Sequence, residues 1–291
     1  MGLFQYLLTA AKCVLFALLL CSCTAAGFQE FQLYSQAYNA QYVQGEAVLT
    51  ALGRAERVLF TRRLARTADA QYFQPNDAAF YVDGVEPPTT ASIRTSLTVI
   101  KDYNDAMVAL GNGESAKALT NRISTLTSNA LGAVSATASA MNAPQIVLGT
   151  RSLAASLNFL LKDLPFVNAA LTAASREAFR KQLIASFPVV EAMLIRVRNE
   201  GTPIMYLVLR QARRTRGSEL PTGLTPEAQS GVEQDRKMLA GWVLLLDKTL
   251  VSLRAAKAAA ENGTPINLTN LSNAAIELRM MAEQVKNSQS Q

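Results

Sequence analysis

The chain has 291 residues and no histidine, which excludes Ser-His-Asp and Cys-His nucleophile systems, histidine-based zinc sites and histidine-containing di-iron bundles. Its Lys and Arg residues outnumber Asp and Glu by six, an excess too small and too scattered for nucleic acid as a partner, where clustered cations dominate affinity. Nearly half of the residues are hydrophobic but only 7% are aromatic, as in chains that pack their helices closely.

The first two dozen residues have the organisation of an export signal. A single positive charge precedes residues 13–20, an apolar stretch too short for a hydrocarbon core that needs about 20 residues. The stretch leads into Leu20-Cys21-Ser22-Cys23, which resembles the lipobox of bacterial lipoproteins, with an aliphatic residue three before the cysteine and a small residue directly before it. The resemblance implies that residues 1–22 are a lipoprotein signal peptide and that Cys23 becomes the lipidated N-terminus.

The same resemblance predicts a location in the bacterial cell envelope, where the lipid on Cys23 holds the protein to a membrane. Thr24 follows the cysteine and, by resemblance to enterobacterial sorting signals, favours the outer membrane. Two other interpretations stay open: a secretory signal cut near Ala25 or Ala26, and an uncleaved anchor over residues 3–26. In the lipoprotein interpretation the mature chain keeps one cysteine, which excludes thiol catalysis and an intrachain disulfide.

After a short tether, residues 23–29, apolar residues recur at spacings of three and four, which predicts amphipathic helices. The first helix is expected over residues 30–71, and Gly45 is the candidate position for a bend. Its predicted buried stripe is Phe31, Tyr34, Tyr38, Val48, Leu52, Ala55 and Leu59. A second helix is expected over residues 91–110 and a third over residues 114–141, where Pro144 forces a break.

The next helices are punctuated by prolines. A fourth ends at Leu164, and Pro165 opens a fifth that extends to residue 199 with a kink at Pro188. Gly201 and Pro203 are predicted to separate the fifth helix from a short one over residues 204–216.

The last predicted feature is a helical hairpin. Thr225 can cap its first arm, with Pro226 at the first helical position. The expected buried face of this arm is Val232, Leu239, Trp242, Leu246 and Leu253. Asn262-Gly263 ends the arm, and a final helix covers residues 267–287.

Together these elements predict an all-α protein, an elongated multi-helix bundle of long antiparallel helical hairpins. No stretch is rich enough in Pro, Gly or Ser to divide two cores, so residues 30–287 are read as a single domain, followed by a frayed tail at residues 288–291. The heptad-like seam of the last helix could equally face a second copy of the protein, so self-association stays open.

The residues offer little for catalysis. The best carboxylate pair is Asp102 and Asp105, one helical turn apart, but both are expected on a polar face beside Lys101 and therefore in solvent. The glycine-rich run at residues 111–115 lacks the Lys-Ser/Thr ending and the preceding strand of a phosphate-binding loop. We expect no enzyme, no cofactor and no metal site.

The clearest candidate for binding is the connection over residues 71–90, whose aromatic residues Tyr72, Phe73, Phe80 and Tyr81 alternate with turn-forming residues. Loops of this length within a compact domain tend to be functional. Two interpretations stay open. The aromatic side chains either fold back to cover an open end of the bundle or recognise a partner.

A second candidate is the arginine group Arg210, Arg213, Arg214 and Arg216. Cations at a helix C-terminus also suit the helix dipole, so the group is either structural or a site for anionic lipid headgroups, lipopolysaccharide phosphates or an acidic partner.

The third candidate is the uncharged stretch 123–150, which is rich in Ala, Ser and Thr and too weakly hydrophobic for an ordinary membrane span. It is either a tightly packed central helix or a helix that inserts into a bilayer when the bundle opens.

The sequence thus favours a lipid-anchored, non-catalytic interaction or scaffold module of the envelope, which binds another envelope protein or itself. The alternative is a membrane-active, pore-forming-like helical protein that uses residues 123–150.

Overall fold

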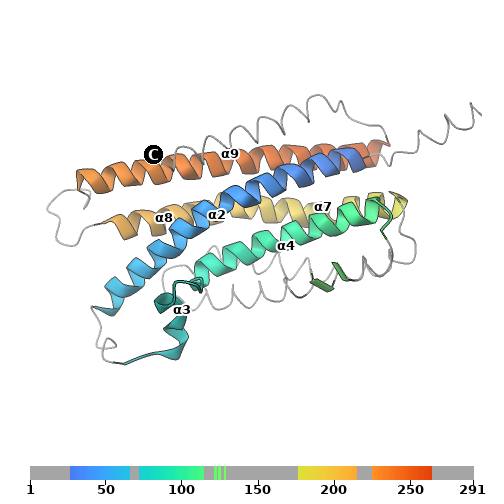
Figure 1. Ribbon diagram of the computed structural model, residues 1–291. Coiled ribbons are helices and arrows are strands. Elements are labelled where there is room, and N and C mark those ends of the chain that lie inside the picture. Colours follow the sequence, from blue (N-terminus) through green and yellow to red (C-terminus); the bar gives the residue numbers. More distant parts are fainter. Residues whose placement is uncertain are drawn as a thin grey trace, which may run out of the picture.

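The structure is a computed structural model that describes residues 27–65, 72–114, 176–214 and 225–263, together with residues 121, 122, 124, 125 and 128. This part of the chain is all-α and contains no strand, which confirms the predicted fold class (Figure 1). The long helices are α2 (Phe28–Leu64), α4 (Pro88–Gly111), α7 (Arg176–Arg196), α8 (Thr202–Arg213) and α9 (Pro226–Asn262).

α2 and the continuous pair α7 and α8 run in one direction, and α4 and α9 run in the opposite direction (Figure 1). α2 packs against α4 and α9, and α7 packs against the other sides of α4 and α9. Because α4 has 24 residues and α2 has 37, the C-terminal part of α2 extends past the first residues of α4 and packs there directly against α8. The bundle is therefore elongated and built from antiparallel neighbours, as the sequence predicts.

The core confirms the predicted periodicity. In α2 the predicted stripe is buried except for Leu59, which packs partly buried against it, and the five residues predicted for the face of α9 are all buried. Edge-to-face contacts of Phe28 and Phe31 with Phe179 close the end of the core where α2 begins, with ring centroids 5.1 and 5.4 Å apart. α2 continues through Gly45, where the absence of a side chain makes room for the ring of Trp242.

Several helix ends differ from prediction by a few residues. α2 begins at Phe28, so the last two residues of the expected tether belong to the helix, and the Phe28 ring is part of the core. α2 ends at Leu64 rather than at residue 71. α4 begins at Pro88, three residues before the predicted start, because proline suits the first helical position, where its missing N–H needs no partner.

The predicted break at Gly201 and Pro203 is wrong. α7 continues through Pro188 and passes into α8 by way of η4 (Val197–Gly201), a π-helical segment. The N–H of Thr202 bonds to the carbonyl of Val197, one residue further back than in an α-helix. This wider turn relieves the clash that Pro203 would make with the carbonyl four residues before it, so the helix continues.

The entry and exit of α9 follow prediction. Thr225 Oγ1 accepts a hydrogen bond from the N–H of Ala228, and Pro226 is the first helical residue. At the other end Gly263 adopts a left-handed φ of 69°, which glycine tolerates best, and its N–H bonds to the carbonyl of Ala259.

Other predictions fall outside the described residues: Cys23 with the signal peptide, most of the third helix, the fourth helix, the helix over 267–287 and the tail. Within the described ranges, no helix combines the length and the apolar character that crossing a membrane requires.

Candidate partner-binding surface

The connection between α2 and α4 contains two short helices, η2 (Pro75–Asp77) and α3 (Ala78–Tyr81), which lie beside the C-terminal half of α2 (Figure 1). Phe80 stacks on Phe60 of α2, with ring centroids 4.3 Å apart and planes 4° from parallel. Tyr81 contacts the Phe60 ring edge-on, with ring centroids 5.4 Å apart, and the Arg63 guanidinium lies 5.3 Å from the Phe60 centroid. Phe60 therefore fixes the position of α3 on the bundle.

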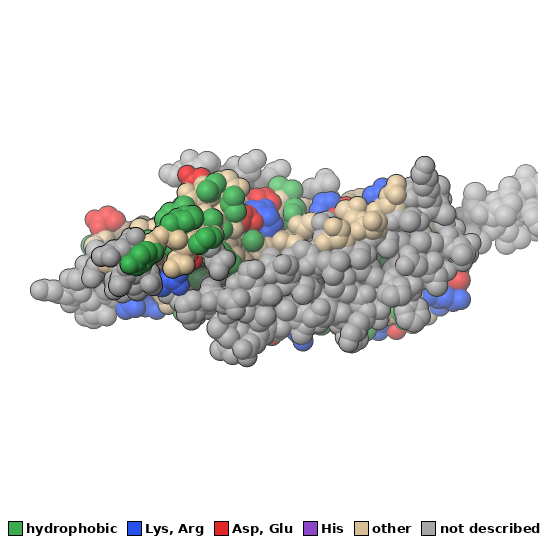
Figure 2. Space-filling view, turned by 90° about the horizontal axis from the view of Figure 1, so that it is seen from below, with side chains coloured by type: hydrophobic (Ala, Val, Ile, Leu, Met, Phe, Trp, Pro, Cys, Tyr) green, Lys and Arg blue, Asp and Glu red, His purple; other side chains and the backbone are tan. Residues whose placement is uncertain are grey.

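Five large apolar side chains of the connection are exposed to solvent. Their exposed fractions lie between 48% and 69%, and they are Tyr72, Phe73, Tyr81, Val82 and Val85, called here the α3 surface. Figure 2 shows hydrophobic side chains gathered at this end of the molecule, with acidic and basic side chains beside them. Of the four aromatic residues that the sequence singles out, Phe80 packs on the bundle, whereas Tyr72, Phe73 and Tyr81 are exposed.

Arg57 fixes the segment that follows α3. Its Nη2 donates hydrogen bonds to the carbonyls of Val82 at 2.9 Å and Val85 at 2.6 Å, with a longer one to Asp83 at 3.3 Å. Arg57 could not be identified from the sequence, because nothing local distinguishes an arginine that binds a distant backbone from one in solvent.

Glu56, the neighbour of Arg57, secures the start of α4. Its carboxylate accepts hydrogen bonds from the N–H groups of Thr89 at 3.2 Å and Thr90 at 2.8 Å, and from the Thr90 hydroxyl at 2.5 Å. Burial raises the pKa of Glu56, and these hydrogen bonds lower it only in part. A signal for this residue did exist: Glu56 lies four residues after Leu52 and three before Leu59, within the apolar stripe of α2.

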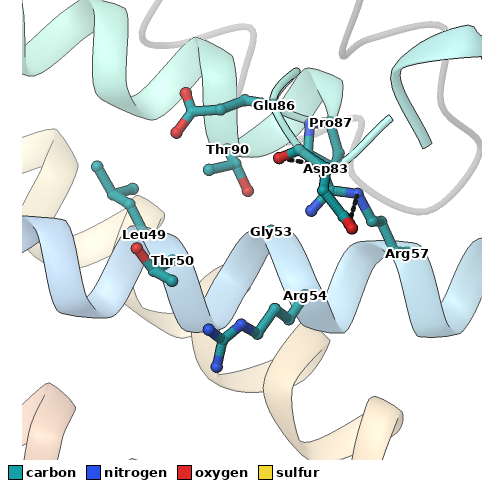
Figure 3. A pocket seen from close by; sticks show the side chains of 9 residues that line it. All are labelled: Leu49, Thr50, Gly53, Arg54, Arg57, Asp83, Glu86, Pro87 and Thr90. Atoms are coloured by element: carbon teal, nitrogen blue, oxygen red, sulfur yellow. Dashed lines mark hydrogen bonds and ion pairs between the residues drawn. The ribbon is translucent and has the colours of Figure 1, made fainter. Parts of the chain in front are cut away.

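Beside the α3 surface a cavity of about 440 Å³ opens between α2 and the start of α4 (Figure 3). It is lined by Leu49, Thr50, Gly53, Arg54, Arg57, Asp83, Glu86, Pro87 and Thr90. Gly53 is buried at this point of α2, and Figure 3 shows Arg54 on the opposite side of the α2 ribbon from Asp83 and Glu86. Glu86 forms an ion pair with Arg94, which also pairs with Glu46.

The predicted arginine group is divided by the structure. Arg213 forms a two-pronged ion pair with the buried Asp235, at 2.5 and 2.9 Å, which is a structural contact. Arg214 is exposed and its carbonyl accepts a hydrogen bond from Arg62, which closes the C-terminal end of α8. Arg210 is partly buried and Arg216 lies outside the described residues. No single anion site therefore gathers the described members.

Asp105, one of the two carboxylates that the sequence singles out, forms an ion pair within α4. Asp105 pairs with Lys101 at 2.7 Å, and the described part of the chain contains no group of three potential metal-ligating His, Cys, Asp or Glu residues. Comparison of the chain with protein-family models, with curated proteins and with solved structures gives no match. The α3 surface and the cavity beside it are therefore identified as a candidate site from their geometry alone.

Proposed function

We propose that this chain is a lipid-anchored protein of the bacterial cell envelope that acts without catalysis. The lipidated Cys23 holds it to a membrane, and Thr24 favours the outer membrane. Its bundle serves as a rigid spacer that presents the α3 surface to another envelope protein.

The length of α2 supports the role of a spacer. Cys23 precedes Phe28, the first residue of α2, by five residues, so the lipid would attach near the end of the bundle where α2 begins. Phe60, which carries α3, lies 32 residues further along the same helix. At 1.5 Å per residue the two ends are roughly 50 Å apart, so the α3 surface would stand well clear of the headgroups.

The observation that carries the proposal is the exposure of the α3 surface. Five large apolar side chains are exposed within fourteen residues, 72–85, on a segment fixed by Phe60 and Arg57. Contiguous apolar patches on a folded surface mark interaction sites, and aromatic side chains contribute most to protein interfaces. A segment that is already held in place loses little conformational entropy on binding.

The anchor is tested by labelling with a fatty-acid probe, followed by membrane fractionation, for the native chain and Cys23→Ala. We expect label and membrane association for the native chain and neither for the variant. A native chain without label and free in solution would overturn the lipid anchor.

The interaction surface is tested by photocrosslinking in cells. A photoreactive phenylalanine analogue replaces Tyr72 or Tyr81, and Val43, an exposed residue of α2 nearer its start, is the matched control site. We expect Tyr72 and Tyr81 to crosslink to the same protein and Val43 not to. Equal crosslinking from all three positions, or none from the α3 surface, would contradict the proposal.

A further inference from the structure

We infer that the cavity beside the α3 surface binds a carboxylate of the partner protein, from an Asp or Glu side chain or a C-terminus, through Arg54. Apolar residues next to that carboxylate would then contact the α3 surface. This inference rests on the proposed function and specifies the chemistry of its partner.

Hydrogen-bond donors without acceptors line the cavity. Arg54 is exposed on α2 and has neither an ion pair nor a hydrogen bond to any residue of the described part. The Nε of Arg57 is buried and has no hydrogen-bond acceptor, although it forms an ion pair with Asp83 and the Nη2 of the same side chain donates to three carbonyls. A planar guanidinium in such a position suits a carboxylate, which it can bind through two parallel hydrogen bonds.

The other charged groups at the cavity favour a singly charged ligand. Asp83 is fully exposed and its carboxylate lies 4.0 Å from the Arg57 Nε, while Glu86 is committed to Arg94. Glu56 is buried, and its carboxylate accepts hydrogen bonds from the N–H groups of Thr89 and Thr90 at the start of α4. A phosphate group with nearly two negative charges would meet these acids with only Arg54 unpaired, whereas one carboxylate matches the one unpaired cation.

The cavity lies next to the α3 surface along the chain. At Gly53 the backbone of α2 packs closely against the start of α4, because a Cβ there would lie 3.6 Å from Pro87 and Thr90, in ordinary van der Waals contact. Two residues that line the cavity, Asp83 and Glu86, directly follow Val82 and Val85 in the chain. The cavity is therefore next to these two residues of the α3 surface. A peptide with one acidic residue flanked by apolar ones would thus reach both features.

The test selects displayed random 12-residue peptides on the immobilised full-length protein in detergent. Selected peptides are then synthesised with their Asp and Glu residues intact or replaced by Asn and Gln. We expect the intact peptides to bind the native protein about tenfold more tightly than the amide versions, the ratio expected for a charge-assisted hydrogen bond.

Arg54→Gln should remove this ratio, so that both peptide versions bind alike, and Arg54→Lys should retain part of it. Lys237→Gln, which removes an exposed cation from α9, should leave the ratio unchanged. Circular dichroism confirms that each variant folds.

The outcomes separate the two proposals. Peptides that depend on Tyr81 but show no acidic preference would overturn the carboxylate site and leave the proposed interaction surface intact. Selected peptides that bind independently of Tyr81 would overturn both. Inorganic phosphate that displaces the peptides better than acetate, at equal ionic strength, would assign the cavity to phosphoryl groups and overturn the inference.

Discussion

Replacing Glu56 with alanine removes the carboxylate that accepts hydrogen bonds from the N–H groups of Thr89 and Thr90 and from the Thr90 hydroxyl. Both threonines are buried, so water cannot readily replace the lost acceptor. The first turn of α4 would keep N–H groups without a partner, close to the positive end of the helix dipole.

The cost can be estimated from these contacts. Loss of a helix N-cap typically costs about 1 kcal/mol, and a buried donor left unsatisfied costs about 1–3 kcal/mol. Removing the carboxylate also relieves the desolvation of a buried charge, which offsets part of this. We expect Glu56→Ala to lower the free energy of unfolding by about 2–3 kcal/mol, a large share of the 5–15 kcal/mol typical of a folded protein.

Urea denaturation measures this change. With an m-value of about 2–3 kcal/mol per molar, the midpoint should fall by roughly 1 M. Glu233→Ala is the matched control, because Glu233 forms only an exposed ion pair with Arg236 and its loss should cost under about 1 kcal/mol. Equal midpoints for the two variants, with unchanged hydrogen exchange at the Thr90 amide, would refute the reasoning.

Three further predictions concern the same region and the opposite end of the bundle. Burial raises the pKa of Glu56 above 4.5, so between 4.5 and the raised pKa the native state binds more protons than the unfolded state. The contribution of Glu56 to the free energy of unfolding therefore falls as pH rises through this range. Glu56→Gln should remove this pH dependence from urea midpoints measured across the range. Gly111→Ala should destabilise by about 1–3 kcal/mol because its Cβ would lie 2.1 Å from the Phe28 ring, whereas Gly53→Ala, with nearest contacts of 3.6 Å, should stabilise by about 0.5–1 kcal/mol in thermal unfolding. Arg57→Gln should release the carbonyls after α3, and limited proteolysis should then cleave the connection before α4 sooner than in the native protein.

The sequence predicts the fold well where one chemical signal decides the structure. Apolar periodicity identifies the buried faces of α2 and α9, and Thr225 and Gly263 mark the limits of α9 because capping depends on neighbouring residues alone. It fails at Pro203, where the local rule predicts a break. The continuous helix is also held by the packing of α8 against α2 and α9, which involves residues far away in the sequence.

The candidate site is less predictable for the same reason. The aromatic residues of the connection are visible in the sequence, but their division into the anchored Phe80 and exposed Tyr72, Phe73 and Tyr81 depends on the position of Phe60. The structural role of Arg213 could not be predicted from the sequence, because its partner, Asp235, lies 22 residues away on another helix.

One turn of α2 supplies both the stability of this end of the bundle and its proposed recognition. Gly53 forms the floor of the cavity, Arg54 provides the free cation, Glu56 secures α4 and Arg57 holds the chain after α3. Arg54 is exposed and serves the proposed recognition, whereas Glu56 is buried and serves stability. Substitutions at residue 56 should therefore change the free energy of unfolding, and substitutions at residue 54 should change binding without changing stability. A fall in stability for Arg54→Gln as large as that for Glu56→Ala would show that Arg54 belongs to the fold, and the carboxylate site would lose its main support.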